Sequence, residues 1–516
     1  MLVYGDRTEA SDLRERLFNI VEQLAAVANT PPGIERHAKL VSALIEAGEL
    51  QQGIEDAGAA SQEIKSLVYK LSFSVIRSWD TGFAEVGEIS NVSRVDGPAS
   101  VELKQPEGFA FYAVYPESYV ASARRLRLVG LPRVIGVRSI GTTLGSVVAA
   151  TLNAPPPVTI RPFGDPFARK VELPAEIIEP AAHYVIVDEG PGLSGSSFGA
   201  VADWLQERGV PLERIAFMPS HDGDLGPCAS EAHRARWHSA QRVPATFDPE
   251  FLEGCFGRLK PFSADTPGER LKYFGDKDGE RVLLKFAGLG ATGERKLAIA
   301  RTLHATGFTA EPLGLIHGFL VERWCADARP LGLFDQPVTE LGRYIGARAR
   351  LLPAPDGEGA TLDQLREMTR RNFGLSFGCA AAAIVDSFGA LGERPRVRTD
   401  NKLDRHEWLR GRDGRLIKTD ALDHHQGHDL IGCQPPEWDV AGAMIEFGLD
   451  QGETDRLIDA TALSLDHSLL GFFQLAYTAF RLGHAVLTGG ADAAVYRRKA
   501  ELLLQSSSRD SARILA

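Results

Sequence analysis

The sequence predicts a multidomain chain of mixed α/β and α+β class, with a helical N-terminal hood, a parallel-sheet domain and a second, bilobal domain. Two observations carry this prediction. The apolar run 184–187 leads through two acids into a Gly/Ser loop that opens a helix, as strands of parallel sheets do. Two further apolar runs, 271–275 and 281–286, flank an Asp/Gly turn and predict a β-hairpin. The length of 516 residues suits about three domains.

Periodicity and composition predict where these parts begin and end. Three runs in the first part have apolar residues at helical spacing, and we expect helices there: 13–28, 34–47 and 64–79. This part carries no catalytic constellation, so we expect it to cap the next domain. The expected divisions are a cap at 1–95, a parallel-sheet domain at 96–247, a linker at 248–264, a second domain at 265–505 and a frayed tail at 506–516.

The end of strand 184–187 has the residue order that binding a sugar phosphate requires. Asp188 and Glu189 lie at its carboxyl end, where α/β sheets hold ligands, and their carboxylates can bind two ribose hydroxyls. Backbone N–H groups of the following loop, with the N-terminus of helix 198–207, can cradle a phosphate. The hydroxyl donors of this loop are Ser194, Ser196 and Ser197. The alternative is a strand followed by a generic Gly-rich turn.

This strand, acid pair and loop resemble the diphosphoribosyl-binding motif of type I phosphoribosyltransferases. In this chain the second acid is glutamate, serines replace threonines, and the loop is one residue longer than usual. The resemblance implies transfer of the phosphoribosyl group of 5-phosphoribosyl diphosphate with Mg²⁺. It implies that Asp188 and Glu189 are catalytic and that Asp188 also binds the metal. The residues that it implies for the 5-phosphate are Ser194, Gly195, Ser196 and Ser197.

Two upstream segments supply candidate ligands for the diphosphate. The apolar run 133–137 ends in a small-residue turn before a helical run at 146–152. In the resembled family such a turn contacts diphosphate through backbone amides beside a cation, which implies roles for Ser139, Gly141 and Arg138.

Residues 161–170 place three cations among Pro and Gly, so we expect a loop rather than a regular element. Arg161 and Arg169 of this segment are expected to balance the leaving diphosphate, and an ordinary solvated basic loop is the alternative.

The next apolar strand, 214–219, ends in polar residues. They either bind the nucleophile that accepts the ribose phosphate or simply terminate the strand. His221, Tyr112 and Tyr115 could shape the acceptor pocket, while core packing is the alternative for the two tyrosines.

The second domain has the element order of a kinase N-lobe. Lys285 lies within the second strand of the expected hairpin, a helix with Glu294 follows over 293–305, and an apolar run at 316–324 breaks into polar residues like a hinge. In such a lobe the lysine holds nucleotide phosphates and the hinge backbone, here near Glu322 and Trp324, holds adenine.

Residues 399–409 and 415–420 resemble the catalytic loop and metal-binding strand of the aminoglycoside phosphotransferase and protein-kinase-like superfamily. The resemblance implies that Asp400 accepts the proton of a substrate hydroxyl, that Lys402 neutralises the γ-phosphate of ATP, and that Asp420 binds Mg²⁺. Asp439 would brace the catalytic loop. Residues 469–487 resemble a C-lobe helix of small-molecule kinases.

One position departs from that family. Where it carries a metal-binding Asn, five residues after Asp400, this chain has Arg405, with His406 next. Magnesium prefers oxygen ligands, so His406 either takes the metal position, contacts phosphate, or leaves a site with one metal. A further group, which comprises Asp423, His424, His425, His428 and Asp429, either binds a metal or forms the surface of an activation segment, and the second is favoured.

These features predict a bifunctional small-molecule transferase that uses 5-phosphoribosyl diphosphate, ATP and Mg²⁺ and acts on a nucleoside-like metabolite. The alternatives are a non-catalytic sensor of these ligands, or one active domain with a degenerate partner. The formal net charge of −11 argues against a broad nucleic-acid interface. Five widely spaced cysteines, no secretory leader and no apolar run of eighteen residues favour a cytoplasmic protein without a membrane anchor. Monomer and homodimer remain open.

Overall fold

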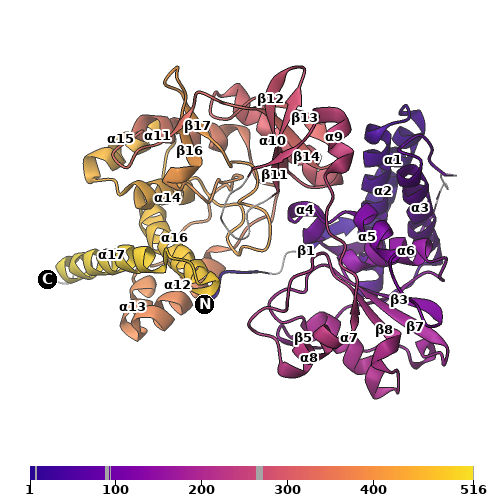
Figure 1. Cartoon of the computed structure of the whole chain (residues 1–516). Coiled ribbons are helices and arrows are strands. Elements are labelled where there is room, and N and C mark those ends of the chain that lie inside the picture. Colours follow the sequence, from indigo (N-terminus) through magenta and orange to yellow (C-terminus); the bar gives the residue numbers. More distant parts are fainter. Residues whose placement is uncertain (6–7, 88–91, 93, 263–270, 515–516) are drawn as a thin grey trace. The chain divides into compact units, whose positions relative to one another are not determined.

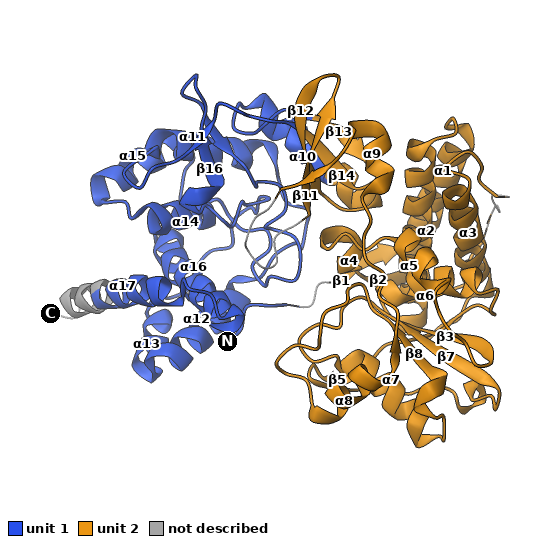
Figure 2. Cartoon of the chain, viewed as in Figure 1, with its two compact units in different colours: residues 1–7, 296–312, 323–516 blue, residues 8–295, 313–322 orange. Residues whose placement is uncertain are grey.

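The computed structural model describes residues 1–5, 8–87, 92, 94–262 and 271–514 (Figure 1). The chain divides into two compact units, shown in Figure 2. The sheet unit contains residues 8–295 and 313–322, and the helical unit contains residues 1–7, 296–312 and 323–516. The chain therefore enters each unit more than once. The domain boundaries expected from the sequence do not follow this division and stay a prediction.

The helices of the sheet unit are α1 (Leu13–Asn29), α2 (Ile34–Asp56), α3 (Gln62–Asp80), α4 (Glu107–Phe111), α5 (Pro116–Ala123), α6 (Ile140–Thr151), α7 (Ser196–Glu207), α8 (Glu231–Ser239), α9 (Glu250–Phe256) and the start of α10 (Gly290–Ala305). The three N-terminal helices expected from apolar spacing are confirmed. Asp12 caps α1, because its carboxylate accepts hydrogen bonds from the N–H groups of Arg14 and Glu15.

The strands of the sheet unit form two five-stranded sheets and two smaller ones. The parallel sheet has the order β4 (Val158–Ile160), β3 (Leu131–Val137), β7 (Ala182–Val187), β8 (Ile215–Met218) and β9 (Gln241–Arg242). The second sheet has the order β10 (Lys260–Pro261), β11 (Lys272–Lys277), β12 (Glu280–Phe286), β14 (Phe319–Arg323) and β13 (Pro312–Ile316). The small sheets pair β1 (Thr8–Asp12) with β2 (Ser100–Lys104), and β5 (Phe163–Asp165) with β6 (Ala168–Lys170).

Helices cover both faces of the parallel sheet, which explains why its strands read as continuous apolar runs. Val185 and Val187 of β7 face the core that contains α2, α3 and α6. Tyr184 and Ile186, the alternate residues, face the core that contains α7. Because successive side chains of a strand point to opposite faces, a strand buried on both sides needs apolar residues throughout.

The N-terminal helices α1–α3 and the second sheet share one apolar core within the sheet unit. This core includes Leu44 of α2, Tyr115 before α5 and Phe286 and Phe319 of the second sheet. The ring centroids of Tyr115 and Phe286 are 5.9 Å apart. The second sheet therefore packs on the same core as the N-terminal helices.

Residues 161–170 correct one expectation, since they form the antiparallel hairpin of β5 and β6 rather than a loop without regular structure. Pro166 lies in the turn, where a missing N–H costs no ladder hydrogen bond. The carboxylate of Asp165 accepts a hydrogen bond from the N–H of Phe167 and closes the turn.

Two further segments differ from expectation. The run 316–324 is divided by a turn at His317 and Gly318, so that β13 ends at Ile316 and β14 begins at Phe319. Both turn residues have positive φ, 40° and 88°, and the glycine adopts this conformation without steric cost. The expected linker 248–264 contains α9 and β10, and its residues 263 and 264 lie outside the described residues.

The helical unit contains most of the C-terminal half. Its helices are α11 (Val338–Leu351), α12 (Leu362–Phe377), α13 (Cys379–Ile384), α14 (Glu437–Phe447), α15 (Gln451–Thr461), α16 (His467–Thr488) and α17 (Ala493–Ile514), and its sheet is β15 (Arg329–Pro330), β16 (Trp408–Arg410) and β17 (Leu416–Lys418). Helix α16 confirms the helix expected over 469–487. Helix α17 continues to Ile514, and the frayed tail expected from 506 stays a prediction. Among the described helices, none combines the length and apolarity that crossing a bilayer requires.

We predict that Gly136→Ala destabilises the protein by about 1–3 kcal/mol. A Cβ at this β3 position would lie 2.0 Å from the carbonyl oxygen of Gly141, a backbone atom that cannot rotate away. Thermal unfolding measures the effect. Gly254→Ala in α9 is the matched control, because a Cβ there meets nothing within 4 Å, and we expect it to be neutral or slightly stabilising. Equal thermal unfolding midpoints for Gly136→Ala and Gly254→Ala would contradict the close approach of Gly136 to Gly141.

Candidate functional site

Two adjacent strands bring the upstream turn and the acidic loop to one edge of the parallel sheet. Strands β3 and β7 pair in parallel with Gly136 opposite Val187, so the loops that follow them begin side by side. A Cβ on Gly141 would lie 2.7 Å from the carbonyl oxygen of Val187. The close approach of these loops therefore depends on a residue without a side chain. The structure brings together the two segments that the sequence predicted to share a ligand.

Asp188 and Glu189 stand at this edge in different surroundings. The Asp188 carboxylate accepts a hydrogen bond of 2.9 Å from the N–H of Glu189, and its backbone carbonyl accepts one of 2.7 Å from the hydroxyl of Tyr119. Burial, followed by the charge of Glu189, raises the pKa of Asp188 well above its ordinary value. Because an adjacent cation would lower this pKa again, the two oxygen-donor side chains fit a divalent cation such as Mg²⁺.

The Gly/Ser loop opens α7 through Gly195, whose φ of 62° places it in the left-handed region. The hydroxyls of Ser194 and Ser196 both donate to the carbonyl of Pro166, at 3.4 and 2.8 Å. These two serines therefore tie the loop to the β5–β6 turn. Ser197 is partly exposed in the first turn of α7, where free N–H groups favour an anion.

The arginines expected to hold diphosphate are paired with acids at the end of α2. Arg138 contacts Asp56 at 2.9 Å and Glu55 at 3.8 Å, and Arg161 contacts Asp56 at 2.5 Å. Arg169 lies on β6 and donates to the carbonyl of Pro162 at 3.4 Å. An anion that binds Arg138 and Arg161 must therefore compete with the carboxylate of Asp56.

The side chains considered for an acceptor pocket lie in different settings. Tyr115 is 2% exposed and donates a 2.7 Å hydrogen bond to the carbonyl of His317, so the core-packing alternative holds for it. Tyr112 is exposed. His221 accepts a hydrogen bond of 3.0 Å from the N–H of Gly223, and burial lowers its pKa.

In the second sheet, Lys285 pairs across neighbouring strands with Glu322 at 2.9 Å, and both side chains are buried. Glu294, the acid that kinase-like order suggested as a partner of this lysine, is exposed on α10. Trp324 follows β14 directly and is partly buried.

In the helical unit, Asp400 is enclosed by cationic and hydroxyl groups. Its carboxylate lies 3.3 Å from His424 Nδ1, 3.4 Å from Lys418 Nζ and 3.8 Å from Arg348 Nη1, and it accepts a hydrogen bond from the Tyr344 hydroxyl. Burial alone would raise its pKa, but these cations hold the pKa well below its ordinary value. Asp400 is therefore ionised and fully buried, which leaves its carboxylate without solvent access.

His424 joins this buried acid to the second predicted acid. Its Nε2 lies 3.4 Å from Asp420, while its Nδ1 faces Asp400, and Asp420 itself is partly exposed after β17. Asp420 is an oxygen donor with access to solvent and fits Mg²⁺. The group of Asp400, Glu407 and His424 fits a cation poorly, because the ammonium of Lys418 contacts both carboxylates.

Asp439 supports the backbone of the loop at Asp400, and Lys402 of this loop forms an ion pair. The carboxylate of Asp439 accepts hydrogen bonds from the N–H groups of Asp400 and Asn401, at 2.8 and 3.0 Å, as the sequence predicted. Lys402 pairs with Glu407 at 2.6 Å and keeps 39% of its side chain exposed.

Arg405, at the position of the missing Asn, and its neighbour His406 have different surroundings. Arg405 donates to the carbonyls of Gly332 and Asp335, so it fixes a loop and offers no metal ligand. His406 is exposed and lies in a group with Asp404 and Glu407 whose donor atoms are within 4.8 Å of one another.

The segment after Asp420 is less exposed than an activation-segment surface would be. Asp423 and His425 are each 1% exposed, and Asp423 pairs with Lys296 of α10 at 2.6 Å. The surface expected from the sequence is therefore wrong at these two positions. The first residues of the chain hold this segment, since the N–H of Gly5 donates to the carbonyl of His428 and the N–H of Leu430 donates to that of Val3.

About half of the chain is similar to solved structures of small-molecule kinases. These include choline kinase LicA from Streptococcus pneumoniae, with 14% identity, 50% of this chain and 97% of that chain covered, and a TM-score of 0.36. A spectinomycin phosphotransferase has 14% identity, with 50% and 95% covered and a TM-score of 0.34. An ethanolamine kinase of Plasmodium vivax has 11% identity, with 50% and 86% covered and a TM-score of 0.34. No family model and no curated protein matches the chain.

We predict that His424 makes stability depend on pH. Burial alone would lower the pKa of His424, but the charge of Asp420 and hydrogen bonds to Asp400 and Asp420 raise it to about 9. The unfolded imidazole titrates near 6.5, so the folded state binds the proton more tightly. The stabilisation is complete below about pH 6.5 and is lost as the pH rises through about 9, by up to about 3 kcal/mol.

Thermal unfolding of the wild type and of His424→Gln across that range tests this prediction. The stability of the wild type relative to the variant should fall as the pH rises. A difference that stays constant with pH would mean that the imidazolium does not hold the two acids together.

Proposed function

We propose that the edge of the parallel sheet binds 5-phosphoribosyl diphosphate and transfers its phosphoribosyl group to an acceptor. The observation that carries this proposal is the parallel pairing of β3 with β7, which starts the Arg138–Gly141 turn and the acidic Gly/Ser loop at the same edge. One loop offers two carboxylates and a helix N-terminus, and the other offers a cation and backbone amides. This combination suits a ligand with ribose hydroxyls at its centre and phosphates at both ends.

Each side chain has a distinct part in this reaction. Asp188 and Glu189 hold the ribose hydroxyls and stabilise positive charge that develops on the ribose ring as the diphosphate leaves. The N–H groups at the start of α7, with Ser197, hold the 5-phosphate. Asp188 would also hold Mg²⁺, which supplies charge neutralisation for the diphosphate when bound.

The arginines bind the leaving group only after they release α2. Arg138 and Arg161 share the carboxylate of Asp56 in the free protein, and the diphosphate offers a higher negative charge than this one carboxylate. Binding is therefore an exchange of partners by two guanidinium groups. Arg169 approaches the same ligand from β6.

We predict that Asp188→Asn with Glu189→Gln abolishes binding of 5-phosphoribosyl diphosphate, measured by calorimetry with Mg²⁺. Asp56→Asn should instead tighten binding by roughly three- to tenfold, because it removes the carboxylate that competes for Arg138 and Arg161. Asp80→Asn is the matched control, since Asp80 at the end of α3 pairs with Arg124, which follows α5. The affinity of this variant should equal that of the wild type. Undiminished binding by the double variant would refute the sheet-edge site.

We propose ATP-dependent phosphorylation of a small-molecule hydroxyl as a second activity. It is favoured by the order of a braced loop, the β16–β17 hairpin and an exposed acid, with His424 between Asp400 and Asp420. Asp420 would hold Mg²⁺, which supplies charge neutralisation for the ATP phosphates when bound. Lys402 would add positive charge at the phosphates, and Asp400 would orient the hydroxyl.

The enclosure of Asp400 favours a different reading, a nucleotide sensor without turnover. Both carboxylate oxygens of Asp400 are occupied by protein groups, and Arg405 is held by backbone carbonyls where the resembled family carries a metal-binding Asn. Phosphoryl transfer would require Asp400 to exchange the contacts with His424 and Lys418 for a substrate hydroxyl.

Two variants separate these readings. We predict that Asp420→Asn abolishes Mg²⁺-dependent ATP binding in calorimetry, whereas Asp400→Asn leaves it unchanged. Transfer of the γ-phosphate to a panel of nucleosides and other small alcohols then decides the activity. A kinase loses all transfer in Asp400→Asn, while a sensor shows none in the wild type. If ATP binds equally to the wild type and Asp420→Asn, the proposed nucleotide site is wrong.

A further inference from the structure

Three side chains from distant parts of the sequence meet in the interior of the sheet unit. His37 lies on α2, Glu117 on α5, and His317 in the turn between β13 and β14, and each is at most 4% exposed. Glu117 Oε1 lies 2.6 Å from His37 Nε2 and 2.8 Å from His317 Nε2. Two imidazole nitrogens thus converge on one oxygen of a buried carboxylate.

Each imidazole is oriented by a neighbouring hydroxyl group. His37 Nδ1 lies 2.9 Å from the hydroxyl of Ser78, which leaves Nε2 as the nitrogen that faces Glu117. The hydroxyl of Tyr115 donates to the backbone carbonyl of His317 at 2.7 Å and fixes the turn that carries this ring. Hydrogen bonds of this kind orient the histidine ligands of metal sites.

Hydrogen bonding alone leaves part of this cluster unsatisfied. Both contacts use Oε1 of Glu117, and Oε2 is buried without a hydrogen-bond partner among the described residues. A buried acceptor without a hydrogen-bond partner destabilises the folded state, and more so when it is charged.

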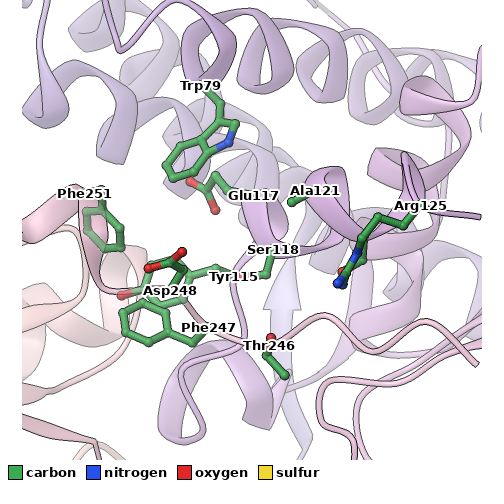
Figure 3. A pocket seen from close by; sticks show the side chains of 11 residues that line it. Trp79, Tyr115, Glu117, Ser118, Ala121, Arg125, Thr246, Phe247, Asp248 and Phe251 are labelled. Atoms are coloured by element: carbon green, nitrogen blue, oxygen red, sulfur yellow. The ribbon is translucent and has the colours of Figure 1, made fainter. Parts of the chain in front are cut away.

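One member of the cluster, Glu117, lines a pocket. A cavity of about 290 Å³ is lined by Glu117 together with Trp79, Tyr115, Phe247, Asp248 and Phe251 (Figure 3). Figure 3 shows Glu117 and Trp79 among the side chains that line this pocket. The ring of Phe251 also lies 5.4 Å from that of His317, so the apolar lining continues to the second histidine. The pocket therefore lies next to the side chain of Glu117.

We propose that His37, Glu117 and His317 form a binding site for a divalent transition metal ion, with Zn²⁺ the preferred ion and its fourth position open to the pocket. Two imidazole nitrogens and one carboxylate oxygen are a common ligand set for zinc. Their donor atoms lie within 4.8 Å of one another, and bonds of about 2.0–2.1 Å to one ion require separations near 3.3 Å. The hydrogen-bonded atoms need only move apart by less than about 1 Å to admit the ion.

Metal binding would resolve the imbalance of the cluster. The ion would accept electron pairs from both Nε2 atoms and from the carboxylate, in place of two donors that share one oxygen. It would also join α2, α5 and the second sheet, through His37, Glu117 and His317 respectively. The fourth position would take water or a donor atom of a small ligand enclosed by the aromatic side chains.

Titration of the metal-free full-length protein with Co²⁺ tests this site, because tetrahedral Co²⁺ bound to nitrogen and oxygen absorbs visible light. Excess Mg²⁺ in the buffer occupies sites made of carboxylates. The wild type should bind one equivalent of Co²⁺ and develop this absorption, and one equivalent of Zn²⁺ should remove it. Glu117→Gln and His317→Gln should lose the absorption. Ser78→Ala should weaken Co²⁺ binding roughly tenfold, since it removes the group that orients His37.

Two controls make the result decisive. His424→Gln and His406→Ala alter the other histidine-containing groups and should retain the absorption. Glu117→Gln keeps an oxygen that can accept from both imidazoles, so circular dichroism should show that it folds. The proposal is overturned if the wild type develops no absorption, or if the absorption survives Glu117→Gln and His317→Gln but is lost in His424→Gln.

Discussion

Burial of helix α2 is the constraint on which the rest of the sheet unit depends. The helix spans 23 residues, about 34 Å, and its apolar side chains lie in the core that also holds β3, β7 and the second sheet. Its first turn carries His37 and its last turn carries Asp56. A single rigid element therefore sets the position of the buried histidine and of the acids that face Arg138 and Arg161. A substitution that shifts α2 in the core would therefore displace both His37 and Asp56.

The buried carboxylates of Asp188 and Asp400, one in each unit, have different surroundings. At the sheet edge, Asp188 and Glu189 stand together. Among the described residues no basic side chain lies at hydrogen-bond distance from Asp188, and its pKa rises. In the helical unit, Asp400 is surrounded by Lys418, Arg348 and His424, and its pKa falls. The acid pair at the sheet edge is suited to bind a metal ion, whereas Asp400 is already neutralised by cationic side chains of the protein. This contrast makes the sheet edge the stronger candidate for a metal-dependent reaction.

Features encoded by local pattern could be predicted from the sequence, and features that join distant segments could not. The strand 184–187, its acids and the helix after Gly195 follow one another along the chain, so period and residue type suffice to place them. The hairpin around Lys285 was predictable for the same reason. The β5–β6 hairpin was missed because short strands with Pro in the turn lack a two-residue repeat. Arg138 and Asp56 are 82 positions apart and Glu117 and His317 are 200 apart, and such pairs leave no mark on local composition.

The path of the chain through the two units limits how the protein can be divided. Residues 313–322 belong to the sheet unit although residues on both sides of them belong to the helical unit, and residues 1–5 pair with the segment near His428. An expressed fragment cut within 248–264 would separate β11, β12 and β14 from the core that they share with α2, and would expose Phe286 and Phe319. A fragment of the C-terminal half alone would also lack the N-terminal residues that hold its own loop. Isolated halves are therefore expected to aggregate, and function is best dissected by point substitution in the whole chain.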